Sequence, residues 1–362
     1  MKILYIINHI DWFWSHRLPL AKGAQGCGYD VHVAVTGGSN DPQLTQEQFT
    51  GHEIPFRNPI KIIAALYRII QEEQPDIVHA ITLKYALLAA LAARKYPQTK
   101  IIHTIAGLGY LFSGEGFKPR ILRLIVLPIF KLAFKNARTQ LIFQNPDDME
   151  LFLKRGLANE GQCHLIRGSG VDMAAFPQTP EPKTDTPIIL MPTRLIIEKG
   201  IAVFIEAAKI LQSKGIKAKH QIAGGLSTTN PNAITECEMR EMLDGSPVEW
   251  LGKVADMPAL YQAANLIAYP SYYGEGVPKV LLEAASTGRA IITTDHAGCR
   301  EAVTDGRNGL LIPIKDPQAL ADAIEVTLND PKMRLRMGQE SRKKAETEFA
   351  VERVVKETLA LY

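Results

Sequence analysis

Residues 269–290 read YPSYYGEGVPKVLLEAASTGRA, and the rest of the chain is organised around this stretch. The apolar run 266–269 predicts a strand, a glycine-containing turn follows, and Pro278 is expected to open a helix because its missing N–H costs nothing at the first helical position. Glu275 then lies in the turn and Glu283 on the first turns of the helix. A helix N-terminus suits an anion such as a diphosphate, and carboxylates accept hydrogen bonds from hydroxyl groups. The stretch therefore indicates a ligand that carries both groups, as a nucleotide sugar does.

The composition is that of an ordinary globular protein. The chain has 362 residues, 46% of them hydrophobic and 22% charged, so two domains are expected. Residues 1–177 hold 19 Lys and Arg against 14 Asp and Glu, whereas the remainder holds 22 against 24. A mildly basic first half is suited to an anionic partner or a membrane surface, and it does not require nucleic acid. We therefore expect no nucleic-acid partner.

The cysteines and the apolar runs indicate a cytoplasmic protein. Cys27, Cys163, Cys237 and Cys299 lack disulfide, zinc or redox spacing, which favours a reducing compartment without a metal site. The apolar run at the start is too short for a signal peptide. No uninterrupted apolar stretch reaches the roughly 18 residues of a membrane span.

Strands and helices alternate along the chain, which predicts βαβ units and parallel sheets with sites at the carboxyl ends of the strands. In the first half, strands are expected at 3–8, 31–35, 77–80, 101–105, 141–144 and 164–166, and helices at 16–28, 60–73, 84–95, 119–136 and 146–155. Strands are expected again at 188–191, 220–223, 248–251, 266–269, 290–293 and 310–312, and two amphipathic helices within 331–361.

The proline-rich residues 176–187 have the composition of a linker. We therefore predict an α/β protein of two Rossmann-like, doubly wound domains that face each other across a cleft. The first domain covers residues 1–177 and the second 178–345, while a helix at about 346–362 packs back on the first.

The first βα turn, residues 8–17, argues against a dinucleotide-binding domain because it contains no glycine. Gly107 and Gly109 follow a later strand without a third glycine, so we expect a tight loop that faces the cleft. Two interpretations of residues 8–17 remain open. Asp11, His16 and Arg17 contact acceptor or donor in the cleft, or Ser15 caps a helix that begins at His16 and the aromatic residues are packed.

The loop after the first strand of the second domain carries Arg194 and Lys199 near a helix start, where two cations suit a diphosphate. A solvated loop is the alternative. Glu275 and Glu283 invite a glycosidase interpretation, but both would line one side of a ligand rather than flank a glycosidic bond. A solvated helix face is the alternative for Glu283.

Residues 117–138 predict a helix with a basic stripe and a broad apolar face, as in helices that lie on anionic bilayers. The basic residues are Arg120, Arg123, Lys131, Lys135 and Arg138. Pro128 is expected to kink or split this helix. The alternative is a buried crossover helix with one wet face.

These residues resemble the GT-B glycosyltransferases of family 4, which are retaining nucleotide-sugar transferases. Glu275 and Glu283 match the family's pair of glutamates separated by seven residues, and Arg194 and Lys199 match its Arg-x4-Lys pair. Residues 12–19, 144–148, 167–172 and 298–301 are similar to a bacterial subgroup that adds sugars to lipid-linked precursors of surface polysaccharides.

The resemblance implies a role for each matching residue. Arg194 and Lys199 hold the donor diphosphate, and Glu283 accepts hydrogen bonds from the ribose. Glu275 contacts the transferred sugar with help from the backbone N–H groups of Gly276 and Val277. The donor is expected to be UDP-linked, and no metal or other cofactor is expected.

The sequence departs from the family pattern in the first domain. The glycine pair of the first turn is absent, and the family's catalytic histidine falls near Ala106, whereas His103 is expected inside a strand. His16 is therefore the candidate for a catalytic residue of this domain.

The resulting hypothesis is a retaining hexosyltransferase that moves a sugar, such as an N-acetylhexosamine, from a nucleotide diphosphate sugar to a polyprenyl-diphosphate-linked acceptor. Such an enzyme would be peripheral on the inner face of the plasma membrane. The alternatives are a GT-B-fold UDP-sugar epimerase, which needs no acceptor, and a non-catalytic scaffold of a membrane assembly complex.

Overall fold

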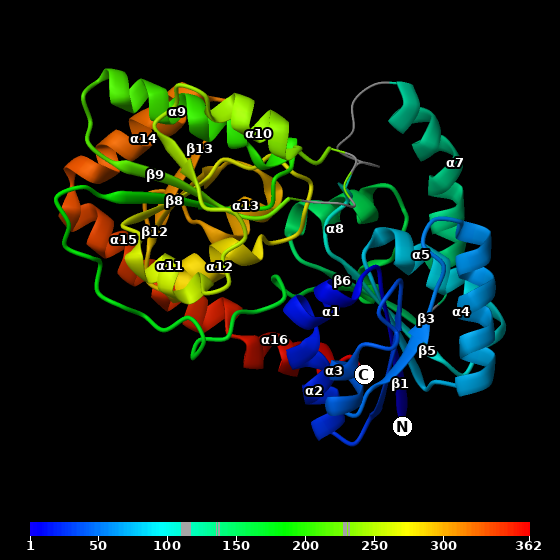
Figure 1. Ribbon diagram of the computed structural model, residues 1–362. Coiled ribbons are helices and arrows are strands. Elements are labelled where there is room, and N and C mark those ends of the chain that lie inside the picture. The colour runs from blue at the N-terminus through cyan, green and yellow to red at the C-terminus, as the bar shows by residue number, and fades with distance from the viewer. Residues whose placement is uncertain (110–116, 135, 137, 227–229, 231) are drawn as a thin grey trace. The chain divides into compact units, whose positions relative to one another are not determined.

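The computed structural model describes residues 1–109, 117–134, 136, 138–226, 230 and 232–362. The chain divides into two compact α/β units (Figure 1). Unit 1 comprises Met1–Gly170, Gly274–Gly276 and Val351–Tyr362, and unit 2 comprises Val171–Tyr273 and Val277–Ala350. Each unit contains its own parallel sheet, which confirms the predicted α/β class.

Within the described residues, unit 1 has a seven-stranded sheet in the order β3-β2-β1-β4-β5-β6-β7, and every neighbouring pair is parallel. The strands are β1 Lys2–Ile7, β2 Asp30–Val35, β3 Thr50–Glu53, β4 Ile77–Ile81, β5 Lys100–Ile105, β6 Thr139–Phe143 and β7 Cys163–Leu165. The helices are α1 Ile10–His16, α2 Leu18–Gly26, α3 Pro42–Gln46, α4 Pro59–Glu73, α5 Leu83–Ala92, α7 Phe117–Phe134, α8 Pro146–Lys154 and α16 Val351–Leu359.

The period-2 alternation of a strand explains why helices cover both faces of this sheet. On β1, Ile3 and Tyr5 point to the face that α1, α2 and α16 cover, and Leu4 and Ile6 point to the face that α4 and α5 cover. Several of these helices begin at side-chain caps, such as Asn58 before α4, whose oxygen accepts from the N–H of Ile60 at 3.0 Å.

Unit 2 has a six-stranded sheet among its described residues, in the order β10-β9-β8-β11-β12-β13 and again parallel throughout. The strands are β8 Ile188–Pro192, β9 Lys219–Ala223, β10 Val248–Trp250, β11 Leu266–Tyr269, β12 Ala290–Thr294 and β13 Gly309–Ile312. The helices are α9 Ile201–Ser213, α10 Glu236–Leu243, α11 Met257–Ala263, α12 Lys279–Ser286, α13 Ala297–Ala302, α14 Pro317–Asn329 and α15 Pro331–Lys344, followed by a π-helical turn at Ala345–Phe349.

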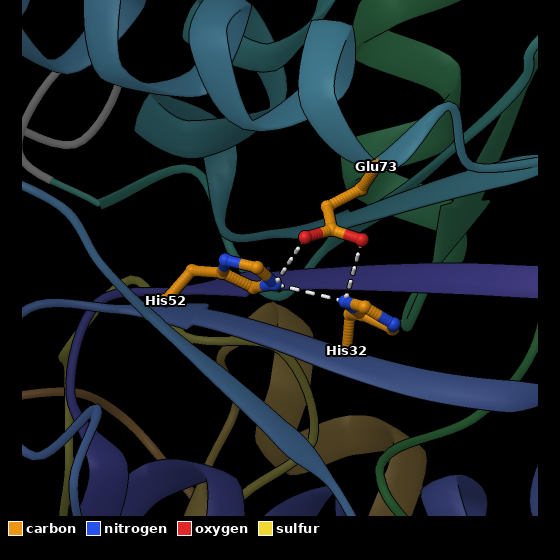
Figure 2. Close-up of side chains that lie close together, drawn as sticks. All are labelled: His32, His52 and Glu73. Carbon is orange, nitrogen blue, oxygen red and sulfur yellow. Dashed lines mark hydrogen bonds and ion pairs between the residues drawn. The ribbon is translucent and has the colours of Figure 1, made fainter.

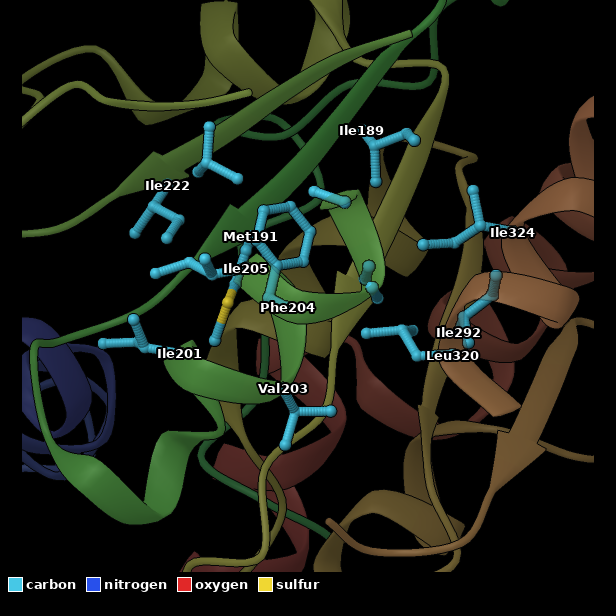
Figure 3. Close-up of a cluster of buried hydrophobic side chains, with 14 of the residues drawn as sticks. Ile189, Met191, Ile201, Val203, Phe204, Ile205, Ile222, Ile292, Leu320 and Ile324 are labelled. Atoms are coloured by element: carbon cyan, nitrogen blue, oxygen red, sulfur yellow. The ribbon is translucent and has the colours of Figure 1, made fainter. Parts of the chain in front are cut away.

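The core of unit 2 also has one apolar cluster on each face of its sheet. Met191 of β8 and Ile292 of β12 pack with Phe204 of α9 and Leu320 of α14, and all four are fully buried (Figure 3). The opposite face packs against α11, α12 and α13. The central strands β8, β11 and β12 are therefore buried on both sides, which accounts for their short, nearly continuous apolar sequences.

The proline-rich segment belongs to unit 2 instead of ending unit 1 at residue 177. The hydroxyl of Ser286 donates to the backbone carbonyl of Phe176 at 2.6 Å, and Arg289 Nη2 donates to Thr179 Oγ1 at 2.7 Å. These bonds hold the segment against unit 2, so the division falls after Gly170.

At the other end, the chain returns to unit 1 at Val351 and not at residue 346. Ala345 and Phe349 are buried in the core of unit 2, so the chain belongs to unit 2 as far as Ala350. In unit 1, α16 packs beside α2, and Val354 and Tyr362 join the core of that unit.

Several local predictions were wrong. Helix α1 already spans Ile10–His16 with His9 as its N-cap, so Ser15 lies inside the helix and caps nothing. Pro278 is the N-cap of α12 and the helix begins one residue later. Helix α7 continues through Pro128, so the predicted split is absent there, whereas the kink stays a prediction. The short strand β3 was not predicted, because Thr50–Glu53 at the sheet edge has no apolar alternation.

Candidate functional site

The strand order of unit 2 locates a ligand-binding edge. The first strand, β8, has β9 on one side and β11 on the other, so the order of connection reverses between β8 and β11. Ligands of open α/β sheets bind outside the carboxyl ends of the strands at such a reversal. The loop that follows β8 carries Arg194 and Lys199, and the segment that follows β11 leads through Glu275 to α12.

Lys199 is a buried cation in an aromatic setting. Its side chain is 3% exposed, and Nζ donates a hydrogen bond of 2.6 Å to the hydroxyl of Tyr269. The ammonium also lies 5.2 Å from the ring centre of Tyr269 and 4.9 Å from that of Tyr273. Cation–π contacts of this kind hold a charge in place where water is largely excluded. The alternative of a solvated loop is therefore wrong for Lys199, whereas Arg194 is half-buried.

The loops after β8 and β11 approach each other at backbone level. Gly200 has φ +82°, and a Cβ at this position would overlap the carbonyl oxygen of Pro270. The N–H of Tyr272 donates to the carbonyl of Glu198 at 2.9 Å. Only glycine satisfies both the left-handed backbone and the close approach. Gly200, directly after Lys199, thus permits the close approach of the two loops.

Buried hydroxyl groups on β12 support the loop after β11. Thr293 Oγ1 donates to the carbonyl of Tyr269 at 2.7 Å, and Thr294 Oγ1 donates to the carbonyl of Ser271. These hydroxyls donate hydrogen bonds to carbonyl groups at and beyond the end of β11. A buried segment without regular structure needs such partners for its backbone polar groups. Sequence reasoning assigned no role to Tyr269, Thr293 or Thr294.

Glu283 is enclosed and does not lie on a solvated helix face. Its side chain is 12% exposed on α12, accepts a hydrogen bond from the hydroxyl of Tyr261 at 3.1 Å and lies 3.8 Å from Lys279 Nζ. Burial raises the pKa of Glu283, whereas Lys279 and the Tyr261 hydroxyl lower it. An enclosed carboxylate near a strand-end loop is suited to accept hydrogen bonds from hydroxyl groups of a ligand.

The predicted site residues just before α12 belong to two different units. Glu275 is half-buried and Gly276 buried, and both belong to Gly274–Gly276, which is counted with unit 1. Val277 belongs to unit 2 and packs in its core. Their roles in donor binding remain predictions.

In unit 1 the corresponding reversal lies between β1 and β4. Thr82, directly after β4 and before α5, has φ +75°, a conformation that costs a β-branched residue energy. Asn8 directly follows β1, and its Oδ1 is buried without a hydrogen-bond partner among the described residues. A residue with a strained backbone follows β4, and a residue with an unsatisfied side-chain oxygen follows β1. No sequence signal identified either residue.

The acceptor-side candidates of the first turn differ in their exposure to solvent. Asp11 is exposed, and the His16 ring stacks on Trp12 at 6.0 Å and contacts Ser15 Oγ at 2.7 Å. Arg17 is only 6% exposed, and its Nε has no partner within the described part of the chain. The structure does not bring Asp11 and Arg17 together on one surface.

Burial lowers the pKa of Arg17 to about 10, although the nearby Tyr362 and Tyr5 raise it. The contact of Arg17 with an acceptor stays a prediction, and it would need a ligand that reaches into the core of unit 1.

His103 lies inside β5, as expected. Both ring nitrogens are buried without partners in the described residues, and burial lowers the pKa of His103 to about 3. A neutral, enclosed imidazole is not placed for acid–base catalysis. Gly107 and Gly109 after this strand have φ +99° and +54°, a conformation that favours glycine, and the tight loop that faces the cleft stays a prediction.

Helix α7 presents both charge and apolar surface. Lys131 is exposed, and Leu124 and Leu132 are 74% and 54% exposed. On the other side Phe130 and Phe134 pack against Phe152 in the core of unit 1. The side chain of Arg120 and the whole of Lys135 lie outside the described residues, while Arg123 is half-buried and Arg138 is exposed beyond the helix. None of the described helices is long and apolar enough to cross a membrane.

Comparisons with known proteins agree with this architecture. The family described as "Glycosyl transferase 4-like" matches residues 2–145, and that described as "Glycosyl transferases group 1" matches residues 172–344. A putative glycosyltransferase of Bacillus subtilis, EpsD, is 30% identical over 383 residues, covering 100% of this chain and 96% of the relative.

A second relative is the N,N'-diacetylbacillosaminyl-diphospho-undecaprenol alpha-1,3-N-acetylgalactosaminyltransferase of Campylobacter jejuni. It is 28% identical over 358 residues, with 94% of this chain and 92% of the relative covered. Among solved structures, HepE of Anabaena in complex with UDP and glucose has a TM-score of 0.80 at 19% identity, with 99% and 98% of the two chains covered. Since the match to EpsD is full-length and both halves match transferase families, this chain belongs to the GT-B glycosyltransferases, with a 4-like first domain and a group 1 second domain.

Proposed function

We propose that this glycosyltransferase moves a sugar such as an N-acetylhexosamine from a UDP-sugar to a polyprenyl-diphosphate-linked acceptor in surface polysaccharide synthesis, with retention of the anomeric configuration. The observation that carries the donor half is the enclosed cation Lys199 at the strand reversal of unit 2. The acceptor half is supported by the Campylobacter relative, whose name specifies a diphospho-undecaprenol acceptor.

Arg194 and Lys199 bind the donor diphosphate. The Lys199 ammonium is already oriented by the Tyr269 hydroxyl at 2.6 Å, so little reorganisation is needed when the phosphate arrives. As the sugar leaves, negative charge grows on the terminal phosphate of UDP, and fixed cations in a water-poor site stabilise that charge.

Glu283 accepts hydrogen bonds from the ribose hydroxyls. Its enclosure makes these bonds stronger than they would be in water, since little solvent competes for the carboxylate. Glu275 and the N–H groups of Gly276 and Val277 contact the transferred sugar.

Retention follows if the acceptor hydroxyl attacks the anomeric carbon from the face that UDP leaves. The bond between the anomeric carbon and the phosphate oxygen breaks, the new glycosidic bond forms on the same face, and the acceptor proton passes to the leaving phosphate. This route needs no protein nucleophile. His16, on the acceptor side, is the candidate for positioning the acceptor.

The transfer step requires no divalent metal, because Arg194 and Lys199 supply the positive charge at the diphosphate. The initial rate should be unchanged within minutes of adding a chelator, and Mg²⁺ or Mn²⁺ should not raise it. A rate that depends on either ion would contradict this part of the proposal.

The enzyme works as a peripheral protein at the inner face of the plasma membrane. The exposed Leu124 and Leu132 lie on α7 with Lys131, a combination that suits insertion beside anionic headgroups.

The test combines purified enzyme, a panel of UDP- and GDP-sugars and a polyprenyl-diphosphate-linked sugar acceptor. Release of nucleotide together with an elongated lipid product supports the proposal, and the anomeric proton coupling in that product should match the donor's. Mass-neutral conversion of a UDP-sugar without acceptor would indicate an epimerase. Absence of transfer with every donor, together with unchanged donor binding in Glu283→Ala, would indicate a non-catalytic scaffold.

A further inference from the structure

Three metal-binding side chains meet on one face of the unit 1 sheet, apart from the residues assigned to sugar transfer (Figure 2). They are His32 of β2, His52 of β3 and Glu73, the last residue of α4. His32 Nδ1 lies 2.8 Å from His52 Nε2 and 3.7 Å from Glu73 Oε2. His52 Nε2 lies 4.0 Å from Glu73 Oε1. One nitrogen of each ring and the carboxylate thus converge on one point.

The strand register explains this convergence. β2 and β3 pair so that His32 is opposite Thr50 and Ala34 is opposite His52. The two histidines are therefore diagonal neighbours on the same face, because side chains two residues apart on a strand share a face. Helix α4 covers that face, and its end brings Glu73 over both rings.

The spacing and the donor atoms fit zinc. Tetrahedral Zn²⁺ with bonds of about 2.0–2.1 Å holds its ligand atoms about 3.3–3.4 Å apart. The 2.8 Å between the two ring nitrogens lies below that value, whereas the 3.7 Å from His32 Nδ1 to Glu73 Oε2 and the 4.0 Å from His52 Nε2 to Glu73 Oε1 lie above it. Two imidazole nitrogens and one carboxylate oxygen form a known zinc ligand set that leaves a fourth position for water.

A second carboxylate orients the first ligand. Asp30 Oδ2 lies 3.1 Å from His32 Nε2, which favours the proton on Nε2 and leaves the lone pair of Nδ1 directed at His52 and Glu73. Metal-bound histidines usually donate their other N–H to a carboxylate in this way.

Lys2 carries a positive charge that opposes a cation at this group. Its Nζ donates to Glu73 Oε2 at 2.7 Å and competes for that oxygen. The Lys2 bond goes to the oxygen that lies 3.7 Å from His32, whereas the other oxygen, Glu73 Oε1, lies 4.0 Å from His52 Nε2 and is directed at that ring. The Glu73 side chain is 25% exposed, whereas His32 is buried, which places the entry path for an ion beside Glu73.

We propose that His32, His52 and Glu73 bind one Zn²⁺ that joins the edge strand β3 and the end of α4 to β2. The site is structural in role. Glu73 ends α4 just before the amino end of β4, whereas ligand sites of such sheets lie at the carboxyl ends. The proposal does not depend on the proposed transferase function.

The test titrates metal-free, full-length protein with Zn²⁺ by calorimetry and with Co²⁺ by visible absorption. We expect one ion per chain, the absorption of tetrahedral Co²⁺ and a higher melting temperature with Zn²⁺ than without it. His52→Ala and Glu73→Gln should weaken binding at least about tenfold, as should Asp30→Asn through the orientation of His32. Lys2→Met should strengthen binding because it releases Glu73.

His164→Ala is the matched control, since it removes one half-buried histidine from the opposite edge strand β7 and should leave affinity unchanged. If His52→Ala fails to fold, Glu73→Gln at the helix end still decides the question. The proposal is overturned if the parent protein does not bind Zn²⁺ at micromolar concentration, or if His52→Ala or Glu73→Gln binds as tightly as the parent. Because binding is measured directly, this result is separate from any outcome of the transfer assay.

Discussion

At the residue scale, the most informative feature is the enclosure of charged groups for which the sequence alone left a solvated position as an alternative. Lys199 lies under two tyrosine rings, and Glu283 is held by the Tyr261 hydroxyl. Enclosed charges interact more strongly with a ligand than solvated ones do, so their removal should have large effects.

Lys199→Met keeps the length and packing of the stem and removes the charge. We expect kcat/KM for the donor to fall about 10²–10³-fold, the size of effect seen when one transition-state stabilising group is lost. Tyr269→Phe should cause a smaller loss, since it removes only the 2.6 Å bond that orients the ammonium. Lys217→Met, at an exposed loop position, is the control. A loss of less than twofold in Lys199→Met would exclude the assigned role.

Glu283 should make donor affinity depend on pH. Its pKa is raised mainly by burial, and only the ionised carboxylate accepts two hydrogen bonds from the ribose. Donor affinity is therefore expected to be full above this raised pKa and to fall as pH decreases through it. Glu283→Gln should bind the donor about tenfold more weakly and lose that pH dependence. Calorimetric Kd values between pH 5 and 8 test this, and a parallel pH dependence in the variant would assign it to another group.

At the element scale, the contact between the loops after β8 and β11 shapes the proposed donor site. Apart from one 3₁₀ turn at Ile197–Lys199, the two loops lack regular structure, yet backbone hydrogen bonds and the Thr293 and Thr294 hydroxyls hold them. The close approach depends on Gly200, where both the positive φ and the lack of a side chain are required.

Gly200→Ala should destabilise unit 2 more than Gly245→Ala does. Gly245 also has positive φ, at +64°, but an added Cβ there would meet nothing within 4 Å. The control should therefore cost only the left-handed conformation, about 1–2 kcal/mol. Gly200→Ala adds the overlap with Pro270, and chemical denaturation should show a larger loss together with reduced donor affinity. Equal losses in the two variants would show that the loop contact is not tight.

Helix α7 should bind anionic membranes. Reversing Arg123 and Lys131 to glutamate is expected to reduce partitioning onto phosphatidylserine- or phosphatidylglycerol-containing liposomes at least about tenfold, given about 1 kcal/mol per basic residue near the surface. Lys209→Glu with Lys217→Glu changes net charge equally in unit 2 and serves as the control. Liposome flotation measures both. Unchanged flotation of the α7 variant would instead support the alternative, a buried crossover helix with one solvent-exposed face.

At the scale of the whole molecule, histidines are part of the buried cores of both units. His79 and His103 lie in the unit 1 sheet and His220 lies in unit 2. Burial is the main cause that lowers the pKa of all three, to about 3 for His103 and about 4 for His220. Each must remain neutral while the protein is folded.

Stability should therefore fall as pH decreases below about 6.5. In that range the unfolded chain binds protons at these histidines while the folded chain does not, so each contributes a loss of about 1.4 kcal/mol per pH unit. Denaturation at pH 7, 6 and 5 measures the slope. His103→Phe, which can pack in the same apolar site, should reduce it, and a slope unchanged in this variant would show that other groups dominate acid unfolding.

The sequence by itself determined the features that are local in the chain. Strand–helix alternation predicted two parallel sheets, and the spacing of Glu275 and Glu283 with that of Arg194 and Lys199 predicted the family. Hydrophobic periodicity reports which segments are buried, and this information is contained in neighbouring residues.

Tertiary structure decided the rest. It placed β8 beside β11, enclosed Lys199 among tyrosines, gave Thr82 a positive φ and brought His32, His52 and Glu73 together from three separate elements. It also joined the proline-rich segment to unit 2 through Ser286 and Arg289. Strand order, register and enclosure arise from contacts between residues far apart in the chain, and no local pattern encodes them.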